Sequence, residues 1–254
     1  MGYFDVEKLS ISFGGVQALM DISLSVNQGE IYSIVGPNGA GKTTLFNCVS
    51  RYYDPQEGSV LFKGEEILKL KADQLAGRGI ARTFQNIELF KEMTVLDNLL
   101  LGQHYRMKTG FLRHMAFLPS VRREETRARR RVEEIIDFLD IQPARWQLVG
   151  NLPFGIQKFV EVARALSLEP EIILMDEPAS GMVVEEREDL AMFIREMRDE
   201  LDITILLVEH DLRLVMDISD RVMVLNNGVM IAEGLPRDVQ NDPAVITAYI
   251  GEEE

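Results

Sequence analysis

The sequence predicts an α/β fold with a mostly parallel sheet, an antiparallel β-subdomain at the N-terminal end and an inserted α-helical subdomain. The length of 254 residues fits one compact unit better than several domains. The N-terminal residues alternate apolar and polar side chains, whereas the last third alternates apolar runs with helical segments. Strands that alternate with helices indicate a parallel sheet covered on both faces.

The first part of the chain is expected to form an antiparallel sheet and then a buried strand. Ile22, Leu24 and Val26 follow the period of two, and the apolar stretch EIYSIVG comes next. The following expected elements are a glycine-rich turn over 36–41, a helix over about 42–50, and short strands near 59–62 and 80–84.

The middle of the chain, from about 94 to 146, has a helical pattern with an interruption near 109–119. Within it, the run RREETRARRRVEE mixes the two charge signs at helical spacing, so we expect a solvated helix with Glu–Arg pairs rather than a nucleic-acid patch. The last third then reads IILMD, a helix over 185–200, ITILLV, a helix after His210, and RVMVL with VMIAEG as a closing pair of strands.

Composition and charge argue against nucleic-acid-binding, secreted and membrane-spanning proteins. The chain has 27 Lys and Arg against 41 Asp and Glu, a net charge of −14, which argues against nucleic acid as a partner. The single cysteine, Cys48, fits a reducing compartment. The start of the sequence lacks the pattern of a signal peptide, and no apolar run reaches the roughly 20 residues that span a bilayer. We therefore expect a soluble, cytoplasmic chain.

A glycine-rich segment between a strand and a helix matches the phosphate-loop template. Its residues are Gly36, Pro37, Asn38, Gly39, Ala40, Gly41, Lys42 and Thr43. Glycines let several backbone N–H groups point at one anion, and the helix adds its N-terminal partial charge. Lys42 can reach the β- and γ-phosphates, the Thr43 hydroxyl can ligate Mg²⁺, and Thr44 can add one more hydroxyl. The alternative, a glycine-rich turn that happens to carry a lysine, is disfavoured by the flanking strand and helix.

Polar residues follow three other apolar runs. Asp176 and Glu177 end the run IILMDE, where Asp176 can hold the Mg²⁺ shell and Glu177 can orient or deprotonate a water. Taken alone, Asp-Glu after a strand is also common surface chemistry. His210 follows ITILLV, and Gln85 ends RTFQ, where its amide can ligate Mg²⁺ or hold a water.

The series GPNGAGKTT, RTFQ, ILMDEP and VEHD, in this order and spacing, resembles the nucleotide-binding subunit of an ABC transporter over nearly the whole chain. It is most similar to the ATP-binding subunits of branched-chain amino acid importers, with further support from QHYRMKTG, NLPFG, DEPASGM, EHDLRLVMDISDRVMVLNNG and DPAVITAYIGE. The resemblance implies a P-loop ABC ATPase fold that binds ATP and Mg²⁺, with Glu177, His210 and Gln85 as catalytic residues. It also implies that Phe13, just ahead of two glycines, stacks on adenine; the alternative is a core residue of an edge strand.

The same resemblance implies an organisation for the chain and a setting for it. One ABC ATPase domain over 1–254 would comprise a core at 1–93 and 166–254, a helical subdomain at 94–165 and a short C-terminal helical tail at 235–254. Two such subunits would form a head-to-tail dimer around two ATP molecules, on the inner face of the cell membrane. The implied partners are integral membrane permeases, a second ATP-binding subunit (a paralogue, or a second copy), and indirectly a solute-binding protein outside the membrane.

Two segments depart from the family pattern. The signature Leu-Ser-Gly-Gly-Gln, which contacts the partner's ATP, is here Leu152, Pro153, Phe154, Gly155, Ile156 and Gln157. Gly155 at a helix start still favours an anion, although the serine hydroxyl is missing. Val183 stands where most members have an aspartate. We therefore expect an asymmetric dimer, in which the chain's own ATP site is competent and the site it completes for its partner is weaker.

Three alternatives remain open at this level. The first is a soluble ABC-type ATPase that is not coupled to transport, and the second is a small-molecule kinase that shares the phosphate loop. The third is an ABC subunit for another solute, such as urea, short amides or aromatic acids, or for export. A single module with a net charge of −14 and the Asp176–Glu177 pair favours a transport-coupled ATP hydrolase.

Overall fold

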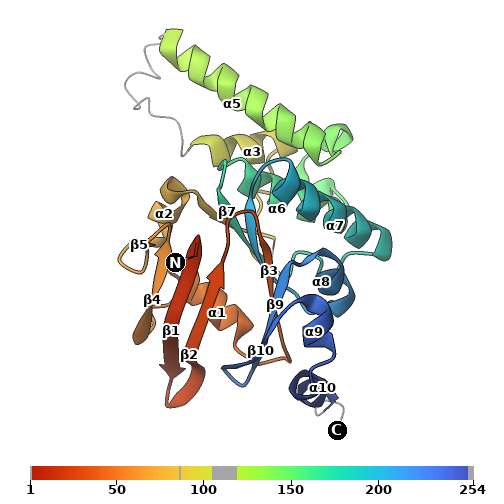
Figure 1. The fold of residues 1–254 in the computed structure, drawn as a ribbon. Coiled ribbons are helices and arrows are strands. Elements are labelled where there is room, and N and C mark those ends of the chain that lie inside the picture. The colour runs from red at the N-terminus through yellow and green to blue at the C-terminus, as the bar shows by residue number, and fades with distance from the viewer. Residues whose placement is uncertain (1, 86, 105–118, 251–254) are drawn as a thin grey trace.

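The computed structural model describes residues 2–85, 87–104 and 119–250. Two sheets form its centre: a six-stranded sheet in the order β10-β9-β3-β8-β7-β6 and a four-stranded sheet in the order β2-β1-β4-β5. Helices cover the larger sheet, and one group of helices lies at the end of the molecule farthest from the C-terminus (Figure 1). Among the described residues, no helix combines the length and the apolar character that a membrane crossing requires.

The six-stranded sheet is parallel except at one edge. β3 pairs in parallel with β8 and β9, β7 pairs in parallel with β6 and β8, and β10 is antiparallel to β9. Its strands are β3 (Ile31–Val35), β6 (Ile80–Arg82), β7 (Ile172–Asp176), β8 (Thr204–Val208), β9 (Arg221–Asn226) and β10 (Val229–Gly234). Every residue of β3, β7 and β8 is buried, because helices cover both faces. The predicted parallel sheet and closing strand pair are confirmed.

The four-stranded sheet is antiparallel, as the alternating pattern predicts. It consists of β1 (Phe4–Phe13), β2 (Val16–Val26), β4 (Glu57–Phe62) and β5 (Glu65–Glu66). The alternate apolar residues of β1 and β2 pack against α1 (Lys42–Val49) together with residues of the larger sheet. The N-terminal sheet therefore supports one side of the phosphate loop.

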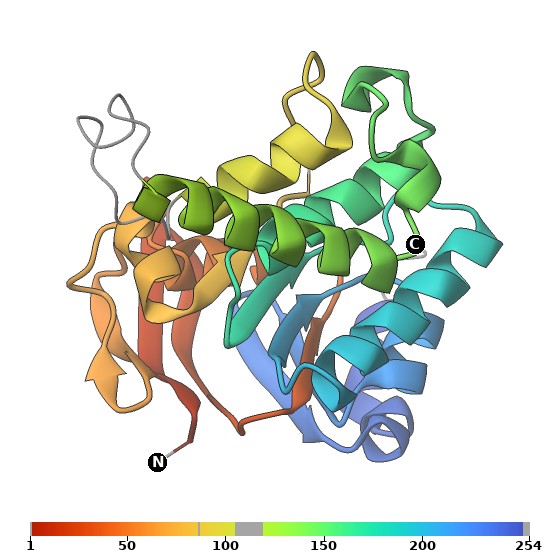
Figure 2. The same ribbon diagram turned by 90° about the horizontal axis from the view of Figure 1, so that it is seen from above.

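The helices between β6 and β7 are α3 (Val95–His104), α5 (Pro119–Phe138) and α6 (Phe154–Leu166). α5 carries the charged run, and Glu134 pairs with Arg130 and Arg131 at 3.2 Å each, so the expected solvated helix with Glu–Arg pairs is present. The expected interruption near 109–119 and most of QHYRMKTG lie outside the described residues, as does the end of the C-terminal tail. α6 runs beneath α3 and α5 and joins them to the larger sheet (Figures 1 and 2).

The remaining helices lie along the core. They are α2 (Ala72–Leu75), α7 (Val184–Asp199), α8 (Leu212–Ile218), α9 (Pro236–Gln240) and α10 (Pro243–Ile250). α7 matches the helix expected over 185–200, and α8 follows His210 as expected.

One strand is shorter than expected. The sequence predicts a strand over 80–84, but β6 ends at Arg82. The Thr83 N–H still donates to the Leu174 carbonyl at 2.9 Å, whereas the Phe84 N–H donates to the Glu161 carboxylate on α6 at 3.1 Å. The chain therefore leaves the sheet at Phe84 because α6 supplies the acceptor.

Candidate active site

The predicted site residues gather at one edge of the larger sheet. The phosphate loop follows β3, Gln85 follows β6, Asp176 ends β7 with Glu177 directly after it, and His210 follows β8. Because these four strands are parallel, their carboxyl ends lie at the same edge, where open α/β sheets bind ligands. The structure brings the candidates from four separate segments to one place.

The phosphate loop requires glycine at its two ends. Gly36 has φ 151°, and a Cβ there would lie 2.0 Å from the Leu225 carbonyl oxygen. Gly41 has φ 106°, and its Cβ would lie 2.8 Å from the Ala18 carbonyl oxygen. Neither position accommodates a side chain, so the neighbouring strands β9 and β2 fix the path of the loop.

Lys42 begins α1 with its side chain folded back over the loop. Its Nζ donates to the carbonyl oxygens of Gly36 at 2.6 Å and Pro37 at 2.9 Å. Asn38, Gly39 and Thr43 are exposed, and Thr44 is partly exposed. The loop therefore presents accessible polar groups around an ammonium group that is itself buried, as binding a phosphate chain requires.

Asp176 is a buried carboxylate with one oxygen available. Its Oδ2 accepts from Arg82 Nη2 at 2.7 Å, whereas Oδ1 has no hydrogen-bond partner among the described residues. Burial raises the pKa of Asp176 above its usual range, and the Arg82 hydrogen bond opposes that rise. A buried carboxylate oxygen without a donor fits a divalent cation, so the residues present are compatible with Mg²⁺.

The described part of the chain contains no group of three or more His, Cys, Asp or Glu side chains arranged to hold a metal. Mg²⁺ is commonly held by one or two protein ligands together with waters and substrate phosphates. Asp176, Thr43 and Gln85 are thus a donor set that would need the nucleotide to complete it.

Arg82 is a site residue that sequence reasoning missed. Its Nη1 donates to Asn47 Oδ1 at 2.9 Å and to the Ser50 hydroxyl, both on or beside α1. Its guanidinium also lies over the Phe84 ring, 5.3 Å from the centroid. Arg82 thus joins the phosphate-loop helix to Asp176, a role that the letters RTFQ could not indicate because the partners are distant in the sequence.

Glu177, Gln85 and His210 meet around one carboxylate oxygen. Glu177 Oε2 accepts from Gln85 Nε2 at 2.8 Å and lies 3.8 Å from His210 Nδ1. The Glu177 backbone has φ 48°, and its N–H donates to the Val208 carbonyl at 2.9 Å, which turns the side chain toward the loop edge. Gln85 and His210 therefore both approach the Glu177 carboxylate.

Glu209, which also lay outside the predicted set, ties two loops together beneath His210. It is fully buried; Oε1 accepts from the Ala179 N–H at 2.8 Å, and Oε2 accepts from the His210 N–H at 3.1 Å. Burial raises the pKa of Glu209 above its usual range. The position of His210 is thus coupled to the segment that leads to Val183.

Phe13 is exposed at the end of β1, with 44% of its surface accessible. Its ring meets Tyr53 edge-on, with centroids 5.1 Å apart and planes at 66°. The exposure of Phe13 differs from the alternative of a buried core residue and leaves part of its ring accessible to a planar ligand. Tyr53, which supports the ring, was missed because it lies beyond α1 in the sequence.

The predicted signature segment surrounds the start of α6. Pro153 caps the helix, Phe154 begins it, and Gln157 Nε2 donates back to the Leu152 carbonyl at 2.8 Å. Ile156 packs partly against the core, while the Phe154 ring covers Gly181, whose Cβ would lie 2.7 Å from it. This segment does not join the catalytic cluster; it faces outward next to the exposed side chains of Val183 and Val184.

The comparison with protein families matches two models. The model described as ABC transporter matches residues 19–180, and the model described as branched-chain amino acid ATP-binding cassette transporter matches residues 229–254. Among curated proteins, the chain is 40% identical over 248 residues to the high-affinity branched-chain amino acid transport ATP-binding protein BraF of Pseudomonas aeruginosa, covering 98% of this chain and 97% of that protein. It is 41% identical over 247 residues to LivG of Escherichia coli, a protein of the same description, with 97% of each chain covered.

Solved structures give the same result at the level of the fold. An ATP-binding cassette of an ABC transporter in its ADP conformation superposes with a TM-score of 0.86 and 35% identity, covering 99% of each chain. A dimeric cassette in a post-hydrolysis state, bound to ADP and phosphate, superposes with a TM-score of 0.77 and 25% identity, covering 92% of this chain and 99% of that one.

Proposed function

This chain belongs to the ABC transporter family, and we propose that it is the ATP-hydrolysing subunit of an importer for branched-chain or related amino acids. The contact of Gln85 and His210 with the Glu177 carboxylate, beside a phosphate loop, is the observation that supports hydrolysis most strongly. The solute follows from the names of the similar BraF and LivG proteins.

In the proposed reaction, the phosphate loop and Lys42 bind the triphosphate, and Phe13 stacks on the adenine. Thr43, Asp176 and Gln85 would hold Mg²⁺, which when bound neutralises phosphate charge and orients the β- and γ-oxygens. Glu177 accepts a proton from a water whose oxygen attacks the γ-phosphorus, and the bond to the bridging oxygen of ADP breaks. His210, whose Nδ1 lies 3.8 Å from Glu177 Oε2, would donate to a γ-phosphate oxygen.

ABC importer subunits of this kind dimerise and work with membrane permeases; the arrangement that we propose for this chain is a head-to-tail pair with a paralogous subunit. The exposed apolar side chains of Phe154, Val183 and Val184 support a contact surface at the start of α6 and α7. Permeases on the inner face of the membrane, and a solute-binding protein acting through them, complete the proposed assembly.

The experiment is to purify the tagged chain from its own membranes with the subunits that accompany it, and to measure MgATP hydrolysis and uptake of labelled leucine in proteoliposomes. We expect permeases and a second ATP-binding subunit in the complex, and uptake that requires both ATP and a solute-binding protein. Hydrolysis without any associated permease would instead indicate an ATPase that is not coupled to transport. Robust hydrolysis that drives uptake of urea or an amide but not leucine would overturn the proposed solute alone.

A further inference from the structure

Helix α6 carries a row of charged side chains on a face that is otherwise buried. Lys158, Glu161 and Arg164 are spaced by three residues, so they lie along one side of the helix. The side chains of Lys158 and Glu161 are 2% and 3% exposed and lie 3.9 Å apart. Their neighbours Val160 and Val162 are core residues.

All three charged groups contact the backbone of the segment that contains Gln85. Glu161 Oε1 accepts from the Phe84 N–H at 3.1 Å, and Lys158 Nζ donates to the Gln85 carbonyl at 2.9 Å. Arg164 Nη1 donates to the Glu88 carbonyl. Since these bonds are to backbone atoms, they hold the main chain at Phe84, Gln85 and Glu88 whatever side chains those positions carry.

A buried ion pair of this kind is not needed for a stable helix–sheet contact. Apolar residues of similar volume often stabilise such a position as well or better, because they avoid the cost of removing two charges from water. Burial raises the pKa of Glu161 to about 6, because removal from water disfavours the charged carboxylate. The pair is therefore better explained by what it positions than by the stability it contributes.

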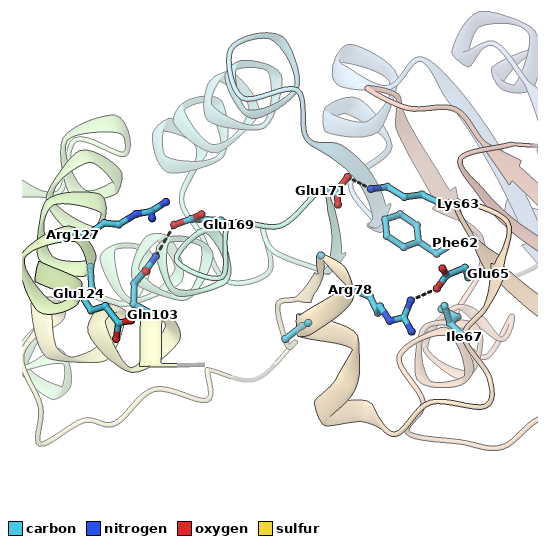
Figure 3. Close-up of a pocket in the computed structure, with 14 residues that line it drawn as sticks. Phe62, Lys63, Glu65, Ile67, Arg78, Gln103, Glu124, Arg127, Glu169 and Glu171 are labelled. Carbon is cyan, nitrogen blue, oxygen red and sulfur yellow. Dashed lines mark hydrogen bonds and ion pairs between the residues drawn. The ribbon is translucent and has the colours of Figure 1, made fainter. Parts of the chain in front are cut away.

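Helix α6 is a main connection between the other helices of the inserted group, α3 and α5, and the edge of the larger sheet that carries Gln85 and Glu177. On the side of the antiparallel sheet, Gln103, Glu124 and Arg127 face Phe62 and Lys63 across a cleft of about 920 Å³ (Figure 3). The cleft separates these helices from the antiparallel sheet on that side, whereas Glu161 and Lys158 on α6 bond directly to Phe84 and Gln85.

We propose that Lys158 and Glu161 are positioning residues that hold the Gln85 carboxamide against Glu177, so that a displacement of α6 is passed to the hydrolytic edge. The inference rests on the proposed function, because it assigns a purpose to the contact at 2.8 Å between Gln85 Nε2 and Glu177 Oε2. The first turn of α6 contains Phe154 and Gly155, so contact of another subunit with that turn would reach Gln85 through this pair.

The test compares variants that remove each polar contact with variants that keep it, in the complex purified from membranes. Lys158→Met and Glu161→Leu remove the donor and the acceptor, whereas Lys158→Arg and Glu161→Gln keep them. We expect the first two to lower kcat about tenfold, the loss for one charged hydrogen bond, with KM for ATP changed less than about threefold. The conservative variants should recover most of kcat. Arg221→Met is the matched control. It removes the ion-pair partner of another buried carboxylate, Glu30, at a site that does not contact Gln85, and it should leave kcat unchanged.

Hydrogen exchange gives a second readout. The Phe84 amide should exchange faster in Glu161→Leu than in Glu161→Gln, because only the former lacks an acceptor. An active wild-type complex with unaltered kcat in both Lys158→Met and Glu161→Leu would overturn the inference alone. Equal loss of kcat in the Arg221→Met control would also overturn it, since the effect would then be one of stability. A wild-type complex without ATPase activity would overturn the proposed function and the inference together.

Discussion

The catalytic edge and the signature face of this molecule differ in how their side chains are satisfied. At the catalytic edge, formed by the ends of β3, β6, β7 and β8, the polar groups contact one another: Gln85 and His210 approach Glu177, and Arg82 binds Asp176. At the signature face, formed by residues 152–157 and 178–184, Phe154, Val183 and Val184 are exposed. The first region is assembled within one chain, and the second presents an apolar surface to something outside it.

The difference indicates where a variant should act. Substitutions at the catalytic edge should change binding or hydrolysis of the nucleotide that this chain itself holds. Substitutions at the signature face should leave the affinity for that nucleotide unchanged and should change association with another subunit. The predictions below test this division, beginning with the largest effect.

Glu177→Gln should have the largest effect. The amide keeps the contact with Gln85 but cannot accept a proton, so kcat should fall by roughly 10²–10⁴ while ATP affinity stays within about threefold. Steady-state hydrolysis and equilibrium binding of ATP measure the two quantities. Near-normal hydrolysis would show that Glu177 is not the base.

Lys42→Ala should weaken nucleotide binding. Loss of the charged hydrogen bonds to phosphate costs about 1.5–3 kcal/mol, which is roughly a 10- to 100-fold loss of ATP affinity. Isothermal titration calorimetry with MgATP measures the affinity. Lys69→Ala, at an exposed lysine, serves as the control. Equal affinity in the Lys42 and Lys69 variants would remove Lys42 from the site.

Glu161→Gln tests helix α6, which joins the two regions, through the pH dependence of the free energy of unfolding. The pKa of Glu161 in the folded chain, about 6, lies above the ordinary value of 4.5, so the folded state binds this proton more tightly than the unfolded state does. The contribution of Glu161 to wild-type stability therefore falls as the pH rises from about 4.5 to above 6. Glutamine does not titrate. Relative to the wild type, the variant should therefore gain about 2 kcal/mol in free energy of unfolding between pH 4.5 and 7. Urea denaturation at several pH values measures it, and a difference that does not change with pH would contradict the assigned burial.

Val183→Lys should have the smallest effect on the chain's own chemistry. A charge on the exposed apolar surface should weaken association with the second ATP-binding subunit by about fivefold, the equivalent of about 1 kcal/mol of apolar contact. ATP affinity of the chain should change less than about twofold. Met192→Lys, at an exposed site on α7, is the control. If both variants weaken association equally, the signature face has no special role in it.

The sequence predicts local features of this molecule better than distant contacts. The phosphate loop, the carboxylates after IILMD and the antiparallel start all follow from neighbouring residues, and the structure contains each of them. Arg82, Glu209 and Tyr53 could not be identified in advance, because their partners come from other segments of the chain. The early end of β6 has the same cause, since Glu161 takes the N–H of Phe84.

The most direct test of the account is single-turnover hydrolysis of γ-phosphate-labelled ATP by the purified complex. We predict a fast release of phosphate that E177Q in this chain abolishes and that V183A, at an exposed residue of the signature face outside α6, leaves unchanged. A fast phase that persists in E177Q would contradict the assignment of Glu177 as the base. A fast phase that disappears equally in both variants would contradict the division of roles between the catalytic edge and the signature face.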